Sequence, residues 1–137
     1  SVTLEDGRVL RAPLVVGAEG RGSVVRKATG VGVTGWDYPQ TGVVATVRLA
    51  RGHEGVAHEY LLPGGPFAIL PLTEDRASLV WTESRAKAAA LKAASPQAFH
   101  AHLQRRFGEF LGAATLDGPV FTYPLSLQLA ERMTDGP

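Results

Sequence analysis

Residues 43–83 read VVATVRLARGHEGVAHEYLLPGGPFAILPLTEDRASLVWTE, and this stretch decides the class of fold. Apolar runs of strand length alternate with short polar, glycine or proline breaks, which is typical of successive β-strands. The predicted strands are Val43–Leu49, Ala57–Leu62, Phe67–Leu72 and Ala77–Glu83. Because the connections between them are short, we expect an antiparallel meander.

The sequence after this stretch predicts two helices and a final strand. Residues 84–94 are rich in Ala, Lys and Leu, which favours a helix, and Ser95-Pro96 is a typical helix start. The second helix is predicted to end at Gly112 and to carry one apolar stripe. The stripe comprises Phe99, Leu103, Phe107, Phe110 and Leu111. A last strand, Val120–Leu129, contains Pro124, which indicates an edge strand or a bulge. The pattern predicts an α+β fold, a mostly antiparallel sheet with helices packed on one side.

The sequence before this stretch predicts a hairpin, a buried strand and a short helix. Asp6-Gly7 is a two-residue turn signal within the hairpin. The apolar run Leu14–Val16 predicts a strand buried on both faces. Ser23 is the predicted N-cap of a helix over Val24–Ala28. Residues 30–40 are expected to form a loop.

Composition and charge exclude several classes of protein. The 137 residues are 45% hydrophobic and 20% charged, a normal balance for one globular domain. The net charge of +1 gives no field that would gather nucleic acid or an anionic membrane. Cysteine is absent, which excludes disulfides, thiolate catalysis and cysteine-ligated metals. The chain begins with Ser1 inside a predicted strand, so we expect a piece of a longer protein.

Two further patterns are weak signals of function. Gly30–Gly35 spells GxGxxG, but a dinucleotide fingerprint follows a strand and opens a helix, whereas this one follows a helix, so we predict a loop. The four histidines show no metal-ligand spacing, so we predict surface positions and no metal site. They are His53, His58, His100 and His102.

The segment LVVGAEGRGSVVR, residues 14–26, combines a strand, a glycine-rich turn and a capped helix start. It is either a plain strand-to-helix connection or an anion site, because glycines admit a ligand to the backbone and arginine suits phosphate. It resembles the DGxxSxxR fingerprint of flavoprotein aromatic hydroxylases. Glu19, Gly20, Ser23 and Arg26 stand at its Asp, Gly, Ser and Arg positions. WDYPQ at 36–40 and EYLLPGGPFAILPL at 59–72 extend the resemblance to the ubiquinone-biosynthesis hydroxylases.

The resemblance implies a class A flavin monooxygenase of the 2-polyprenyl-6-methoxyphenol hydroxylase type. Such an enzyme uses FAD and NAD(P)H to hydroxylate the ring of a polyprenylated phenol. Residues 1–35 are then a remnant of the FAD-binding domain, and residues 36–137 are the middle, substrate-binding domain of a para-hydroxybenzoate-hydroxylase-like flavoprotein. The implied cofactor contacts are Glu19, Gly20, Ser23, Arg26 and Gln40. No residue is an evident catalytic base, and the chain alone is expected to retain little FAD.

The substrate site is expected to be a long apolar cleft, because a polyprenylated phenol is mostly hydrocarbon. Candidate wall residues from one face of the strands are Leu61, Phe67, Ile69, Leu79 and Trp81. A register shift of one residue would move this set, and the same side chains could instead pack against the predicted second helix. A face that meets the rest of the protein should also be apolar. The candidates for that face are Tyr60, Phe67, Ile69 and Trp81.

Two other interpretations of function remain open. One is a stand-alone small-molecule binding or interaction domain without catalysis. The other is a related flavoprotein with epoxidase, halogenase or reductase chemistry. The favoured interpretation predicts a cytoplasmic enzyme with no nucleic-acid partner. Peripheral association with the inner membrane or with a multi-enzyme biosynthetic complex is a further expectation.

Overall fold

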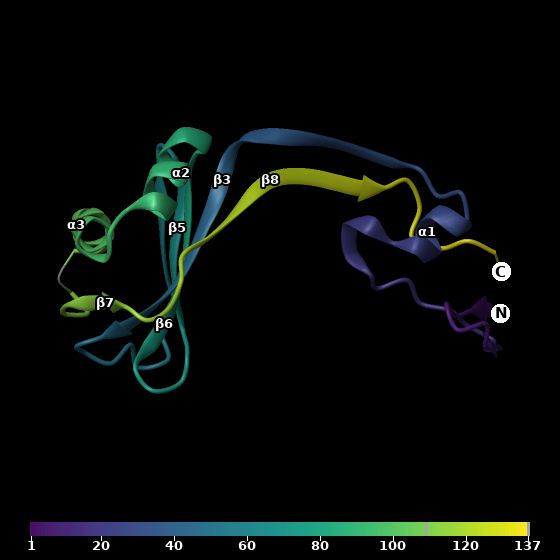
Figure 1. The fold of residues 1–137 in the computed structure, drawn as a ribbon, viewed down its shortest axis with the longest axis horizontal. Helices are drawn as coiled ribbons and strands as arrows, with labels where there is room; N and C mark the ends of the chain where they lie inside the picture. The colour runs from purple at the N-terminus through teal and green to yellow at the C-terminus, as the bar shows by residue number, and fades with distance from the viewer. Residues whose placement is uncertain (109, 137) are drawn as a thin grey trace. The chain divides into compact units, whose positions relative to one another are not determined.

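The computed structural model describes residues 1–108 and 110–136, which form two compact units (Figure 1). The first unit comprises Ser1–Trp36 and Leu127–Pro137, and the second comprises Asp37–Ser126. The residues from Leu127 onward therefore group with the first unit, although the sequence alone assigned them to the second. The assignment of either part to a cofactor or a substrate domain stays a prediction.

The first unit is built from short elements. β1 (Val2–Thr3) and β2 (Val9–Leu10) pair antiparallel, which confirms the predicted hairpin. A 3₁₀ turn, η1 (Gly20–Gly22), leads into α1 (Val24–Ala28). Ser23 caps α1 as predicted, because its side chain accepts a hydrogen bond from a backbone N–H of the first turn.

The predicted buried strand at Leu14–Val16 is wrong. These residues form no strand, and the side chains of Leu14 and Val16 are each 74% exposed. A strand buried on both faces needs neighbouring strands, and no described strand of the chain pairs with this segment. The apolar run therefore lies at the surface of the first unit.

A six-stranded sheet forms most of the second unit, although residues 33–36 and 127–130 of its strands belong to the first unit. Its strands are β3 (Val33–Leu49), β4 (His58–Leu62), β5 (Gly65–Pro71), β6 (Arg76–Ser84), β7 (Ala114–Leu116) and β8 (Phe121–Ala130). The order is β4-β5-β6-β3-β7, and β8 pairs with β3. The meander is confirmed for β4, β5 and β6, but β3 lies beside β6 rather than β4. All four predicted central strands are present, and β7 was not predicted.

β3 begins earlier than the sequence predicts. Residues 33–40 were expected in a loop, but they continue the strand to a length of 17 residues. Gly35 permits a close approach between strands, since a Cβ there would lie 2.6 Å from the Leu127 carbonyl oxygen. The GxGxxG pattern therefore runs from a turn into a strand and opens no helix, so it lacks the context of a dinucleotide fingerprint.

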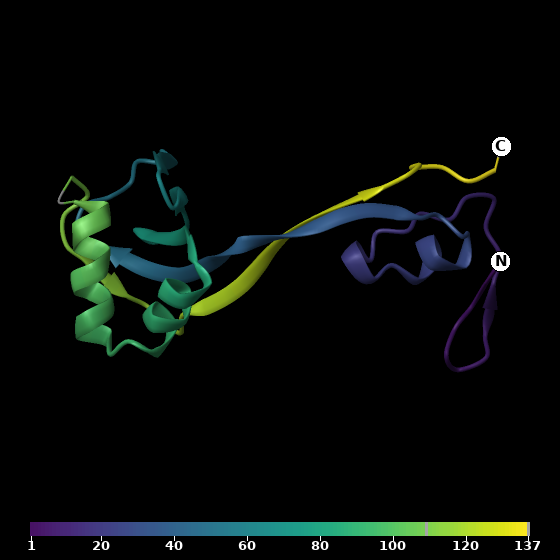
Figure 2. The ribbon, with the colours of Figure 1, turned by 90° about the horizontal axis from the view of Figure 1, so that it is seen from above.

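Two helices cover one face of the sheet (Figures 1 and 2). α2 (Arg85–Ala93) and α3 (Pro96–Phe107) confirm the predicted helices, with Ser84 and Ser95 as their N-caps. α3 ends at Phe107 rather than Gly112, because Gly108 adopts a left-handed φ of +73°. The predicted stripe residues Phe110 and Leu111 therefore lie beyond the helix.

The core of the second unit lies between the sheet and these helices. Phe67 and Ile69 of β5 are 0% exposed, and they belong to one buried cluster with Phe99 and Leu103 of α3. The rings of Phe67 and Trp81 meet edge to face with centroids 5.6 Å apart. This packing confirms the predicted α+β class with helices on one side.

Candidate functional site

The glycine-rich turn before α1 is held by the side chain of Glu19. Its carboxylate accepts hydrogen bonds from the Ser23 hydroxyl at 2.5 Å and from the backbone N–H groups of Val24 and Val25 at 3.2 and 3.4 Å. The pKa of Glu19 is lowered, chiefly by the hydrogen bond from Ser23, because these bonds favour the ionised form. The carboxylate thus serves as a second cap for α1.

Ser23 and Arg26 complete this arrangement. The Ser23 hydroxyl accepts a hydrogen bond from the Arg26 backbone N–H at 3.1 Å. The Arg26 guanidinium donates through Nη1 to the Val31 carbonyl at 2.8 Å, which ties the start of α1 to the chain that leaves it. The structure therefore brings the four fingerprint positions of the sequence together in one turn.

The turn has two kinds of group that could bind a cofactor: its backbone, and the Arg26 guanidinium N–H groups other than the Nη1 donor to Val31. A phosphate group does not fit at the start of α1, because the Glu19 carboxylate already occupies that position. The backbone at Gly20 and Gly22 is open, since a Cβ at either residue would meet no atom within 4 Å. These residues fit a cofactor such as FAD that approaches the glycine backbone rather than the helix terminus.

Gln40, the fifth predicted cofactor residue, lies on β3 in the second unit. Its side chain is half-buried and donates through Nε2 to the Gly64 carbonyl at 3.2 Å. This bond ties β3 to the turn between β4 and β5. Gln40 thus supports the end of the sheet at which these two strands turn.

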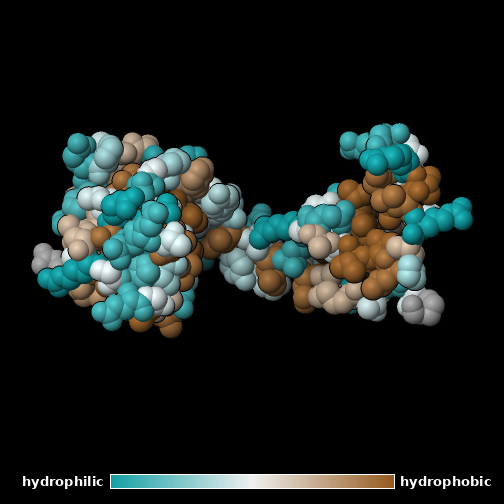
Figure 3. Space-filling view, turned by 90° about the horizontal axis from the view of Figure 1, so that it is seen from below, coloured by the Kyte–Doolittle hydropathy of each residue, from teal (hydrophilic) through white to brown (hydrophobic). Residues whose placement is uncertain are grey.

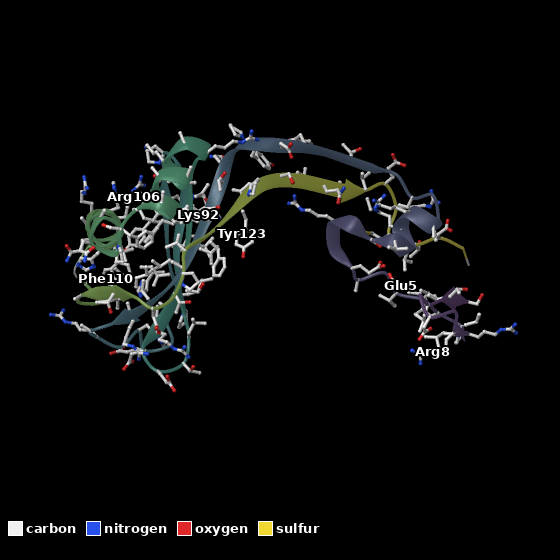
Figure 4. The ribbon with its side chains drawn as sticks, viewed as in Figure 1. Glu5, Arg8, Lys92, Arg106, Phe110 and Tyr123 are labelled. Carbon is white, nitrogen blue, oxygen red and sulfur yellow. The ribbon has the colours of Figure 1, made fainter. Side chains whose placement is uncertain are left out.

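In the part of the chain that the structure describes, no helix covers the second face of the sheet. Ala68 of β5 pairs with Val80 of β6, and Val80 pairs with Val44 of β3, so their side chains share one face. We call this the open face. Its apolar residues are Val44, Leu61, Pro66, Ala68, Leu70 and Val80. Figure 4 shows Tyr123 of β8 on the side of the sheet away from α3. The open face thus carries a cluster of apolar side chains, with Leu61 85% and Leu70 40% exposed, next to the polar Glu59 and Ser78.

Four of the five predicted substrate residues lie on the opposite face. Phe67, Ile69, Leu79 and Trp81 are at most 3% exposed and pack in the core with α2 and α3. Side chains this deeply buried cannot contact a ligand bound at the open face. The structure therefore gives these four residues the packing role that the sequence left open. Leu61 alone lies on the open face.

The sequence reasoning did not place Ala68, Leu70 and Val80 on the face opposite the helices. Both faces of β5 and β6 are apolar, so the alternation along each strand did not reveal which face meets the helices. The sequence analysis allowed for a register shift of one residue, and such a shift would exchange the predicted set of side chains for those on the opposite face.

The exposed apolar surface also lies elsewhere than predicted. Of its four candidate residues only Tyr60 is exposed, at 37%, because the other three belong to the core. In the first unit, by contrast, Leu14, Val16 and Val24 are well exposed. Figure 3 shows hydrophobic residues gathered over a face of this unit. Such a surface is typical of an interface.

The histidines make local contacts. His53 lies 2.8 Å from the Leu72 carbonyl and His100 lies 2.9 Å from the Ala114 carbonyl. The described residues contain no group of three His, Asp or Glu side chains that could hold a metal. Within residues 1–108 and 110–136, no helix has the length and apolar character needed to cross a membrane.

A protein family described as an FAD binding domain matches residues 2–137. The chain belongs to this family. It is 50% identical over 135 residues to the ubiquinone hydroxylase UbiL of Rhodospirillum rubrum, covering 98% of the chain and 32% of that protein. It is 36% identical over 112 residues to the 3-demethoxyubiquinol 3-hydroxylase of Escherichia coli, covering 82% of the chain and 29% of that protein. The chain thus spans about a third of the length of these relatives.

Solved structures of other proteins share the fold. The crystal structure of PqsL from Pseudomonas aeruginosa in complex with 2-aminobenzoylacetate has a TM-score of 0.63 and 30% identity, covering 85% of this chain and 35% of that chain. The flavin-dependent halogenase CmlS has a TM-score of 0.61 at 17% identity, covering 85% and 22% of the two chains, and shows the fold alone. The resemblance to ubiquinone-biosynthesis FAD hydroxylases is confirmed.

Proposed function

We propose that the full-length protein is an FAD- and NAD(P)H-dependent monooxygenase that hydroxylates the ring of a polyprenylated phenol in ubiquinone biosynthesis. The observation that carries the proposal is the 50% identity to a ubiquinone hydroxylase over 98% of the chain. The family match supports FAD as the cofactor. In this proposal residues 1–35 belong to the FAD-binding domain, and residues 36–137 form the substrate-binding domain.

The proposed reaction converts one aromatic C–H bond to C–OH. It consumes O₂, NAD(P)H and one proton, and it releases NAD(P)⁺ and water. Bound FAD supplies the redox chemistry, so the chain itself supplies positioning. We assign cofactor contacts to the Gly20 backbone and to Arg26. Glu19 and Ser23 hold this turn in place through their hydrogen bonds, and Gln40 holds the end of the sheet.

The reaction is tested with purified full-length protein, FAD, NAD(P)H, a prenylated phenol and ¹⁸O₂. We expect the product to gain one labelled oxygen atom, measured by mass spectrometry, with one NAD(P)H consumed per product. Omitting the phenol is the control for uncoupled oxidation. Retained FAD without transfer of label to the phenol would leave the family membership intact and contradict the proposed reaction.

The open face is the proposed wall of the substrate site. Its apolar side chains suit a prenyl tail, because such a tail binds by burying hydrocarbon. Leu70→Asn in the full-length enzyme should raise KM for a long-tailed phenol more than for a short-tailed analogue. Leu10→Asn is the matched control, since Leu10 is 53% exposed in the hairpin of the first unit. Equal effects of the two variants would remove Leu70 from the site.

The same proposal places the enzyme in the cytoplasm, associated with the inner membrane or with a biosynthetic complex. Its support is chemical, because a polyprenyl tail dissolves in lipid rather than in water. Sedimentation of the full-length protein with inner-membrane vesicles tests the membrane association. Protein that stays in the supernatant at low ionic strength would contradict it.

A further inference from the structure

The helical layer of the second unit concentrates positive charge. Residues 84–108, which include α2 and α3, contain five Lys or Arg residues and no Asp or Glu. These five are Arg85, Lys87, Lys92, Arg105 and Arg106. The whole chain has a net charge of only +1. The chain is nearly neutral overall, but this helical layer has a local excess of positive charge. Such a local excess can attract an anion, which the small net charge of the whole chain would not.

Three of these cations line one cavity between α2 and α3, with a volume of about 340 Å³. Lys87 comes from α2, and Arg105 and Arg106 come from α3. Its apolar part is formed by Ala90, which is exposed on α2, above the buried Trp81 and Leu91. The volume is near the lower limit for small-molecule sites, so the cavity suits a compact ligand.

One carboxylate balances part of this charge. The Glu83 side chain is 3% exposed and forms an ion pair with Arg106. Lys87 Nζ lies 3.6 Å from the same carboxylate, and the Trp81 indole N–H donates to it at 3.4 Å. The Arg106 guanidinium also lies over the Trp81 ring, 5.4 Å from its centroid, and Figure 4 shows Arg106 where α3 faces the sheet. Three cations against one carboxylate leave the cavity with a net positive charge.

Arg105 is the cation best placed to meet a ligand. Its side chain is exposed, and its Nε donates to a carbonyl of its own helix at 3.2 Å. The planar guanidinium presents further donors in a fork that matches two oxygens of a phosphate group. Lys87 adds an ammonium group on an exposed side chain from the opposite wall.

We propose that this α2–α3 cavity binds a phosphate group carried on a small apolar or aromatic body. The cations at the rim recognise the phosphate, and the exposed Ala90 with the aliphatic stems of Lys87 and Arg105 accepts the apolar body. The site goes beyond the proposed hydroxylation, because it lies on the helix-covered side of the sheet, whereas the proposed substrate wall is the open face. A soluble phosphomonoester and a phospholipid headgroup share this chemistry, and the experiment distinguishes them.

Calorimetric titration of the full-length protein with FAD bound tests the site. The probes are phenyl phosphate, inorganic phosphate and phenol. We expect phenyl phosphate to bind most tightly, because it alone uses both the charges and the apolar surface. Lys87→Gln/Arg105→Gln should weaken its binding at least tenfold, since one hydrogen bond to a charged group contributes about that factor or more. The control Arg11→Gln/Arg51→Gln removes the same charge from exposed residues outside the helical layer and should change the affinity less than about twofold.

Several outcomes would overturn the site. Equal weakening in both double variants would show a general effect of net charge, and absence of saturable binding by every probe would exclude the site. If Lys87→Gln/Arg105→Gln lowers the melting temperature, the single variant Arg105→Lys replaces it. This variant keeps the charge and removes only the paired donors of the guanidinium. Unchanged affinity of Arg105→Lys for phenyl phosphate would also overturn the proposal. Vesicles with phosphatidylglycerol, compared with phosphatidylcholine alone, form the last arm. Tighter binding to the phosphatidylglycerol vesicles than to phosphatidylcholine vesicles, lost in Lys87→Gln/Arg105→Gln, would support the site and identify the phosphate as that of a lipid headgroup.

Discussion

The replacement Phe67→Ala separates a core role for this side chain from a role in substrate binding. Phe67 is 0% exposed, and its ring lies edge to face with Trp81 at a centroid distance of 5.6 Å. Truncating a fully buried ring costs about 3–5 kcal/mol, through lost burial and through the cavity left behind. We expect a value in the upper half of this range, because the contact between the rings is lost as well. Since domains are stable by about 5–15 kcal/mol, this is a large share of the total.

Urea denaturation followed by tryptophan fluorescence measures the free energy of unfolding of the wild type and the variants. Leu61→Ala is the control, because Leu61 is 85% exposed on the open face and its truncation should cost no more than about 0.5 kcal/mol. The reasoning would be refuted by a loss below about 1 kcal/mol in Phe67→Ala, combined with a raised KM for the prenylated substrate. Those results would return Phe67 to the substrate wall.

Glu83→Gln should lower the free energy of unfolding by about 1–3 kcal/mol, because Arg106 loses the buried carboxylate that it contacts; unchanged thermal denaturation would contradict this. Gly65→Ala should cost about 1–3 kcal/mol in the same assay, since Gly65 has a φ of +123° and an added Cβ would lie 2.5 Å from a side-chain carbon of β6. An NMR titration should give Glu19 a pKa below its ordinary 4.5, and Ser23→Ala should raise it, because the Ser23 hydroxyl stabilises the carboxylate. This lowered pKa means that the ionised cap contributes stability above about pH 4.5 and loses it as the pH falls through the folded-state pKa, so Glu19→Gln should lack that pH dependence.

The elements that the sequence predicted well carry local signals. Ser84 and Ser95 precede helical segments, and each hydroxyl accepts the N–H bond expected of a cap. The Asp6-Gly7 turn likewise depends only on its immediate neighbours. Such signals act over a few residues, so the sequence alone is sufficient to predict them.

The features that could not be predicted depend on contacts distant in the chain. β3 pairs with β6, and no local pattern near Val43 or Trp81 specifies that partner. Phe67 and Ala68 are both apolar, so only the position of the helices decides which of them is core. Leu14–Val16 has the composition of a buried strand, but burial requires neighbouring strands that the described residues do not provide.

The candidate cofactor turn was predicted in part. The fingerprint pattern indicated that Glu19, Ser23 and Arg26 act together, and the structure brings them together. The pattern did not reveal that the carboxylate caps α1, because spacing alone does not show whether an acidic side chain faces a ligand or the N–H groups of its own helix. The available signal for a capping role was the short distance along the chain between Glu19 and the start of α1.

The discontinuous composition of the first unit has a consequence for synthesis of the protein. The Gly32 carbonyl accepts a hydrogen bond from Glu131 N–H at 3.1 Å, and the Thr29 carbonyl accepts one from Arg132 at 3.4 Å. Residues 1–36 therefore leave the ribosome about 90 residues before their partners from Leu127 onward, a delay of roughly 5–18 s at typical translation rates. The second unit is continuous in sequence and has its partners earlier. During this interval the carbonyls of Thr29 and Gly32 lack these partners, so the first unit reaches its final structure only after the second unit has been synthesised.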